Sequence, residues 1–264
     1  MYDLQYSKPS SVNDAVAEIK KSSDAKFLAG GMTMIPTLKA RLSSADMLVD
    51  LKGSNLSYIS VSSSEISIGS MTRHCDVASS SDIKGSLPAL AKLAGGIGDH
   101  MVRSCGTIGG SLANNDPAAC YPSAVLALGA TVVTNERSLK ADEFFEGMFE
   151  TALNEDEVIT EVKFPIPEKA TYIKFPNPAS RYAMVGVFMV KISDGISVAV
   201  TGAGENGVFR CEEIENVLNS NLALDALDNI QISHDDLTSD MHASAAYRAN
   251  LIREMAKQGL KDLI

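Results

Sequence analysis

Two glycine pairs constrain what this chain can fold into and bind. Each follows an apolar run and precedes a hydroxyl residue, in Leu28-Ala29-Gly30-Gly31-Met32-Thr33 and in Gly106-Thr107-Ile108-Gly109-Gly110-Ser111. Glycine permits a positive φ and lets a ligand approach the backbone without meeting a Cβ atom. The two pairs begin 79 residues apart, and this repetition predicts two backbone loops that close on one ligand.

The residues around the glycine pairs indicate an anionic ligand. Neither segment contains Lys or Arg, so an anion held there would depend on N–H dipoles, hydroxyl groups and helix N-termini. A diphosphate fits that chemistry.

Composition excludes several classes of function. The 264 residues carry a net charge of −10, which argues against a nucleic-acid surface, because such a surface needs clustered Lys and Arg. The four cysteines form no C-x-x-C and the four histidines show no ligand spacing. We therefore expect no iron–sulfur cluster or metal site in this chain, no disulfides, and histidines that are surface or structural.

No membrane or targeting segment is expected. The longest nearly apolar stretch, Ala124 to Val133, is about half of what a bilayer requires. The first residues lack a basic region followed by an apolar one. We predict a cytoplasmic location without stable membrane insertion.

Hydrophobic periodicity predicts one large or two modest domains. The first fifty residues read as a β-α-β unit: a helix at 12–19 capped by Ser11, a strand at 26–29, a helix at 34–42 capped by Thr33, and a strand at 47–49. Further strands are expected at 58–61, 66–69, 131–134 and 158–164, and helices at 87–93 and 121–128. Pro165-Ile166-Pro167 reads as a boundary. Antiparallel strands follow at 172–175, 184–191 and 196–201, with a turn at Asp194-Gly195, and then helices at 211–218 and 243–258.

One dinucleotide-binding motif is better read as a turn. Gly202-Ala203-Gly204-Glu205-Asn206-Gly207 matches G-x-G-x-x-G, and Asp225 follows at about the required distance. The motif should open a helix inside a βαβ unit, but Val208-Phe209-Arg210 reads as a returning strand. We therefore expect a turn between antiparallel strands.

Further motifs surround the second glycine pair. Ile97-Gly98-Asp99 and Val102-Arg103 precede it and Asn114-Asn115-Asp116-Pro117-Ala118-Ala119 follows; Lys174-Phe175 and Ala179-Ser180-Arg181-Tyr182-Ala183 come later. Together with Leu28 to Ile35, their order and spacing resemble the flavin-binding subunit of the molybdenum hydroxylases. This family includes aerobic carbon monoxide dehydrogenase and xanthine dehydrogenase. The match extends over nearly the whole chain. In character, the chain most resembles the medium subunit of carbon monoxide dehydrogenase-like enzymes.

The resemblance implies an α+β fold and a three-subunit complex. Residues 1–167 would form an FAD-binding domain of the vanillyl-alcohol-oxidase type (PCMH), with two α+β subdomains at about 1–52 and 53–167. Residues 168–264 would form a smaller C-terminal domain of an antiparallel sheet plus helices. The implied partners are a small subunit with two [2Fe–2S] clusters and a large molybdopterin subunit, arranged as a dimer of heterotrimers.

Carried over residue by residue, the resemblance assigns cofactor binding to two segments and to scattered side chains. Part of the FAD diphosphate would be held by Leu28, Ala29, Gly30, Gly31, Met32, Thr33, Met34 and Ile35, and the rest by Thr107, Ile108, Gly109, Gly110 and Ser111. Asn114 would reach the ribityl or phosphate region, Ile97 and Ile159 would supply apolar contacts, and Lys174 a polar one. Tyr182 would cover a flavin face, or be an ordinary aromatic residue at the start of a strand.

Cys120 departs from the family pattern. The family usually has an aspartate here that contacts the cofactor, whereas a thiol is a weak donor and a poor acceptor. The expected loss is one net hydrogen bond, roughly 0.5–1.5 kcal/mol, which leaves FAD binding as the expectation. Met32 and Ser104 also replace more usual polar residues, which a cradle of backbone amides tolerates.

The implied function is electron transfer: FAD in this chain receives electrons from the partner's [2Fe–2S] clusters and passes them to an external acceptor. No catalytic residue is nominated, because the redox chemistry belongs to the cofactor. Two alternatives are a standalone flavin oxidoreductase that acts directly on a small substrate, and a cofactor-free assembly module. The upstream substrate and the acceptor, whether quinone, NAD or oxygen, stay open.

Overall fold

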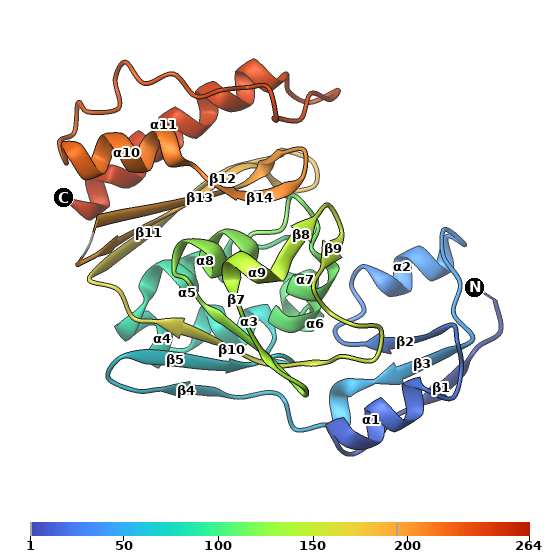
Figure 1. Ribbon diagram of the computed structural model, residues 1–264. Helices are drawn as coiled ribbons and strands as arrows, with labels where there is room; N and C mark the ends of the chain where they lie inside the picture. The colour runs from blue at the N-terminus through green and yellow to red at the C-terminus, as the bar shows by residue number, and fades with distance from the viewer. Residues whose placement is uncertain (1, 194) are drawn as a thin grey trace.

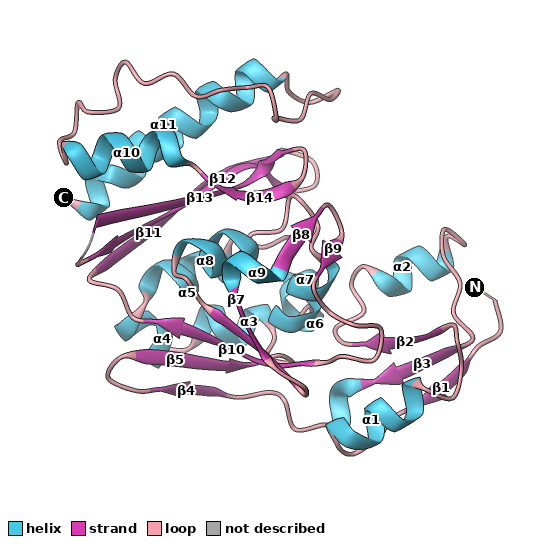
Figure 2. Ribbon diagram, in the orientation of Figure 1, coloured by secondary structure: helices cyan, strands magenta, loops and turns pink. Residues whose placement is uncertain are grey.

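The computed structural model describes residues 2–193 and 195–264 and mixes helices with four sheets (Figures 1 and 2). The N-terminal part is a parallel sheet of β1 (Gln5–Ser7), β3 (Met47–Asp50) and β2 (Ala25–Leu28), in that order. The helices α1 (Val12–Ile19) and α2 (Met34–Lys39) connect its strands, and the one-turn helix η1 (Leu51–Gly53) follows β3. This arrangement confirms the predicted β-α-β unit and adds β1 at its edge.

The two predicted helix caps in this part have different outcomes. The Ser11 hydroxyl accepts a hydrogen bond from the Asp14 amide, so the cap of α1 is confirmed. The prediction for Thr33 is wrong, because its backbone is already helical (φ −100°, ψ −52°) and its side chain makes no capping bond. Helix α2 also ends at Lys39 rather than at residue 42, since Arg41 adopts a left-handed φ of 57°.

The middle part is an antiparallel sheet covered by short helices. Its order is β4 (Ile59–Val61), β5 (Glu65–Gly69), β10 (Ile159–Pro165), β6 (Thr131–Thr134) and β7 (Ser138–Lys140). The helices between these strands are α3 (His74–Ser79), α4 (Ser81–Ser86), α5 (Pro88–Gly95), α6 (His100–Cys105), α7 (Ile108–Asn114), α8 (Tyr121–Ala127) and α9 (Ala141–Phe144). A small hairpin of β8 (Phe145–Gly147) and β9 (Glu150–Thr151) lies beside α7 in Figure 1.

The C-terminal part is an antiparallel meander of β11 (Lys169–Pro176), β12 (Ala183–Ile192), β13 (Gly195–Gly204) and β14 (Gly207–Arg210). The helices α10 (Glu212–Ser220) and α11 (Ala245–Leu263) cover one face of it. Gly204 pairs with Gly207 across the β13–β14 hairpin, which confirms that the G-x-G-x-x-G match is a turn. The predicted turn at Asp194 lies outside the described residues.

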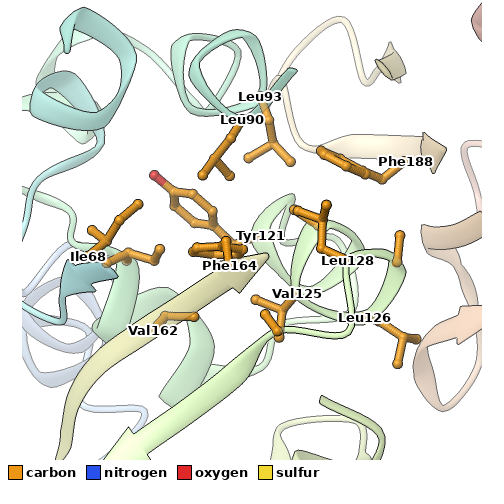
Figure 3. Close-up of a cluster of buried hydrophobic side chains, with 14 of the residues drawn as sticks. Ile68, Leu90, Leu93, Tyr121, Val125, Leu126, Leu128, Val162, Phe164 and Phe188 are labelled. Atoms are coloured by element: carbon orange, nitrogen blue, oxygen red, sulfur yellow. The ribbon is translucent and has the colours of Figure 1, made fainter. Parts of the chain in front are cut away.

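The largest core joins the middle and C-terminal parts. Helices α5 and α8 lie between the five-stranded sheet and the meander, and Figure 3 shows their side chains meeting Phe164 of β10 and Phe188 of β12. Tyr121, Phe164 and Phe188 are each fully buried. This continuous packing fixes the positions of the loops that follow these elements.

Within the described ranges, no helix combines the length and the apolar character that crossing a bilayer would need. The predicted cytoplasmic location stays a prediction.

Candidate functional site

A cavity of about 580 Å³ lies where the three parts of the molecule meet. The segment between β2 and α2 lines one side, the start of α7 another, and residues 174 and 179–182 of the C-terminal part close a third. Its volume is typical of a site for a small molecule or cofactor.

Nearly all the residues expected to bind a cofactor line this cavity. They are Leu28, Ala29, Gly30, Gly31, Met32, Thr33, Met34, Ile97, Thr107, Gly109, Gly110, Ser111, Asn114, Cys120, Ile159, Lys174 and Tyr182. Ile35 and Ile108 do not line it. Ile35 packs against the small cluster of Leu38, Ala45 and Leu48, and Ile108 is fully buried in the main core.

The first glycine segment presents a run of unpaired backbone donors. The N–H groups of residues 30–34 donate to no other group in the described part of the chain, although the segment is tied down by the bond from Ile35 N to Gly31 O (3.0 Å). Gly31 has a φ of 69°, a conformation that favours glycine. Backbone amides that lack partners normally find a ligand or water. This segment therefore has the chemistry of an anion cradle.

Glycine is required at Gly30 by close packing. A Cβ atom there would collide with the carbonyl oxygen of Cys105. At Gly110, a Cβ atom would lie 3.0 Å from Thr107 Oγ1 and 3.3 Å from the Cβ of Ala29. The two glycine segments are thus in contact with each other, as the paired motifs predict.

The second glycine pair is not an open loop, and that prediction is wrong. Gly109 and Gly110 lie in the first turn of α7, because Thr107 caps the helix and Ile108 and Leu112 anchor it in the core. The amides are already bonded: Ile108 N to Thr72 O (3.1 Å), Gly109 N to Ser70 O (2.8 Å), Gly110 N to Thr107 Oγ1 (3.2 Å) and Ser111 N to Thr107 O (3.0 Å). This segment offers hydroxyl groups and a close backbone surface to a ligand.

Cys120, Lys174 and Tyr182 form the end of the cavity toward the C-terminal part. The Lys174 ammonium on β11 donates to the carbonyl of Gly96 (2.6 Å) and to the sulfur of Cys120 (3.6 Å). The Cys120 side chain is buried, whereas Tyr182 is 48% exposed. These residues come from the start of α8 and from both sides of the β11–β12 connection, so the site depends on the C-terminal part.

His74 is a lining residue that sequence reasoning missed. Its burial agrees with the structural alternative of the prediction, and it lines the cavity, with Nδ1 lacking a hydrogen-bond partner in the described part of the chain. Burial lowers the pKa of His74 to about 4, with a smaller contribution from the Arg103 charge. The imidazole is therefore neutral near pH 7. The imidazole lies beside Tyr121, whose ring centroid is 5.4 Å away. This contact arises from the tertiary fold, and no local sequence signal marks it.

Comparison with known proteins identifies the family. Residues 2–167 match the family described as the FAD binding domain in molybdopterin dehydrogenase. The chain belongs to this family. Its cofactor is therefore FAD, and it is a subunit of an FAD-dependent oxidoreductase. The unpaired amides of residues 30–34 and the close backbone contact between the glycine segments fit a cofactor with a diphosphate.

Relatives align over almost the full chain. The glyceraldehyde dehydrogenase medium chain of Sulfolobus acidocaldarius is 32% identical over 99% of this chain and 98% of its own length. The carbon monoxide dehydrogenase medium chain of Hydrogenophaga pseudoflava is 31% identical over 97% of this chain and 96% of its own. Both of these relatives are medium chains of dehydrogenases.

Solved structures share the whole fold. A chain of the reconstituted CO dehydrogenase from Oligotropha carboxidovorans superposes with a TM-score of 0.88 at 28% identity, covering 99% of this chain and 97% of that one. A chain of quinoline 2-oxidoreductase from Pseudomonas putida 86 gives a TM-score of 0.86 at 25% identity, covering 98% and 96%. The fold is therefore shared between relatives whose names indicate different substrates.

Proposed function

We propose that this chain is the electron-transfer subunit of a molybdenum hydroxylase complex that resembles carbon monoxide dehydrogenase. It takes electrons from the [2Fe–2S] clusters of a small subunit and delivers them to an external acceptor. Substrate oxidation then belongs to a molybdopterin large subunit. The complex would be a dimer of heterotrimers.

The observation that carries this proposal is the unpaired amide run at residues 30–34, on the wall of a cavity that three parts of the chain enclose. These amides would hold the FAD diphosphate, and the hydroxyls of Thr107 and Ser111 would face it from α7. Asn114 would contact the ribityl or phosphate region. The ring systems at the two ends of FAD would be surrounded by Ile97, Ile159, Lys174 and Tyr182.

When bound, FAD supplies two-electron storage and one-electron exchange. The protein positions the cofactor, limits the access of water and tunes its potential. The acidic lining residues have structural bonds: Asp99 accepts from Val102 N (2.9 Å), Asp116 from Ala118 N (2.8 Å), and Glu157 pairs with Arg137 (2.9 Å). Because these carboxylates are engaged in structural bonds, we assign none of them an acid–base role. This favours electron transfer over direct chemistry on a substrate.

The domain division is part of the proposal. Residues 1–52 and 53–167 would be the two subdomains of a vanillyl-alcohol-oxidase-type (PCMH) domain, and residues 168–264 the C-terminal domain. In support, the parallel sheet ends at Asp50, the five-stranded sheet ends at Pro165, and the meander begins at Lys169. The family match also ends at residue 167.

A pair of glycine variants tests the site. Gly110→Val directs a side chain at Ala29 in the first glycine segment, so we expect a folded protein that retains less than about a tenth of the wild-type FAD. Gly85→Val is the matched control, because nothing lies within 4 Å of a Cβ atom there and Gly85 is outside the cavity. Circular dichroism checks folding, and absorbance of the released flavin gives occupancy. Full FAD content in Gly110→Val would contradict the assignment of this site.

Electron transfer is tested by rapid mixing. A chemically reduced [2Fe–2S] subunit is mixed with the oxidised holoprotein, and flavin absorbance is followed. We expect the flavin to be reduced as the clusters are oxidised, whereas the isolated chain should turn over no small substrate at the rate of a whole complex. Turnover by the isolated chain would favour the standalone oxidoreductase. A chain that stays colourless after reconstitution with FAD would favour the assembly module.

A further inference from the structure

Lys174 is a cation without an acidic partner in the described part of the chain. It is half-buried on β11 and lines the cavity, and its ammonium group contacts the Gly96 carbonyl and the Cys120 sulfur. No ion pair to Lys174 occurs within residues 2–193 and 195–264. Among the described residues, its ammonium group therefore contacts a carbonyl dipole and a thiol and no carboxylate.

The neighbouring groups supply no compensating negative charge. Tyr172, on the same face of β11 two residues earlier, is buried, and its hydroxyl has no hydrogen-bond partner among the described residues. Burial, with the adjacent Cys120, raises the pKa of Tyr172 well above its usual value, so the phenol stays neutral. The three acidic side chains that line the cavity, Asp99, Asp116 and Glu157, form the other bonds described above.

An uncompensated cation in a partly water-excluded cavity acts strongly on a nearby ligand. At a given distance, Coulomb interactions are stronger in such a site than in bulk water, because the effective dielectric constant is lower. Two-electron reduction places negative charge on a flavin ring, and charge beside the ring is one of the main ways in which a protein tunes this cofactor.

We propose that Lys174, facing the thiol of Cys120 in place of a carboxylate, shifts the reduction potential of the bound flavin to more positive values. This inference rests on the proposed function, because it requires FAD to lie with its isoalloxazine ring at the Cys120–Lys174–Tyr182 end of the cavity. Position 120 is then the tuning residue: a carboxylate there would pair with Lys174 and cancel its effect on the ring.

Three variants separate charge from packing. Cys120→Asp adds a carboxylate beside Lys174, Lys174→Met removes the cation with a side chain of similar length, and Cys120→Ser is the neutral control of similar size. The midpoint potential of the flavin is measured by spectroelectrochemical titration of the holoprotein at one pH and ionic strength, together with FAD content. We expect Cys120→Asp and Lys174→Met to move the potential in the negative direction, and Cys120→Ser to leave it near that of the wild type.

Unchanged or more positive potentials in Cys120→Asp and Lys174→Met, at normal FAD content, would overturn the inference and leave the proposed function standing. A shift in Cys120→Ser as large as in Cys120→Asp would also overturn it, because packing rather than charge would then be responsible. If Cys120→Asp does not fold, Lys174→Met decides alone. A wild-type chain that takes up no FAD would overturn the proposed function itself.

Discussion

Single residues show how the site combines unpaired groups with tight packing. The amides of residues 30–34 and the imidazole of His74 are polar groups left unpaired by the rest of the described chain, and all belong to residues that line the cavity. Gly30 and Gly110 have no room for a larger side chain without moving the other glycine segment or its support. A site of this kind is built mainly from backbone, so it depends little on the identity of side chains such as Met32.

His74 gives a pH dependence of stability. Its pKa is about 4 in the folded chain and about 6.5 when unfolded. Between these values the unfolded state binds a proton that the folded state does not, so stability falls as the pH drops. We expect His74 to contribute a loss of about 3 kcal/mol in the free energy of unfolding between pH 7 and pH 4.

The measurement is urea denaturation of the wild type and of His74→Gln across this range. Because glutamine does not titrate, the variant should lose less stability on acidification than the wild type. Parallel pH profiles for the two proteins would contradict a buried, neutral His74.

At the scale of the secondary-structure elements, the β8–β9 hairpin is tied to the end of α7 by hydrogen bonds. Phe149 at its tip has a left-handed φ of 59° and donates its amide hydrogen to Asn115 O (3.1 Å). The Asn115 side chain in turn donates to the carbonyls of Gly147 (2.8 Å) and Glu150 (2.9 Å). Asn115 lies between Asn114 and Asp116, which both line the cavity, so the hairpin supports that wall.

Phe149→Gly tests this strain. The phenylalanine side chain is 56% exposed, so little packing is lost, while the left-handed backbone costs a non-glycine residue roughly 1–2 kcal/mol. After the extra chain entropy of glycine is subtracted, we expect the free energy of unfolding to rise by about 0.5–1 kcal/mol. Chemical denaturation measures it, with Phe149→Ala as the control that keeps the strain. A loss of stability in Phe149→Gly would show that the Phe149 side chain packs more than its exposure indicates.

Elements with strong periodicity could be predicted from the sequence, whereas several of the short helices could not. Helix α1 and the meander strands have regular apolar patterns and local caps or turns, so their positions agree with the predictions to within a few residues. Helices α3, α4 and α6 have six residues each. Isolated helices of that length are not stable in water and form through tertiary packing. Helix α7 is also short, and two glycines in its first turn lower its helix propensity. The sequence therefore predicts no helix there.

In the whole molecule, the site is an assembly of three parts of the chain that are distant in sequence. The amide run could be predicted from the glycine pair because its chemistry is local. Lys174 and Cys120 are 54 residues apart in the sequence. They are brought into contact by the core that joins α8 to Phe188. The positions of these side chains therefore depend on the tertiary fold, and only the resemblance to a known family could suggest them.

The most direct test of the account is a crystal structure of the protein with FAD bound. We expect diphosphate oxygens within hydrogen-bonding distance of backbone N–H groups in residues 30–34, with α7 on the opposite side and the isoalloxazine ring beside Lys174. A diphosphate bound elsewhere, with those amides still unpaired or bonded to water, would contradict it.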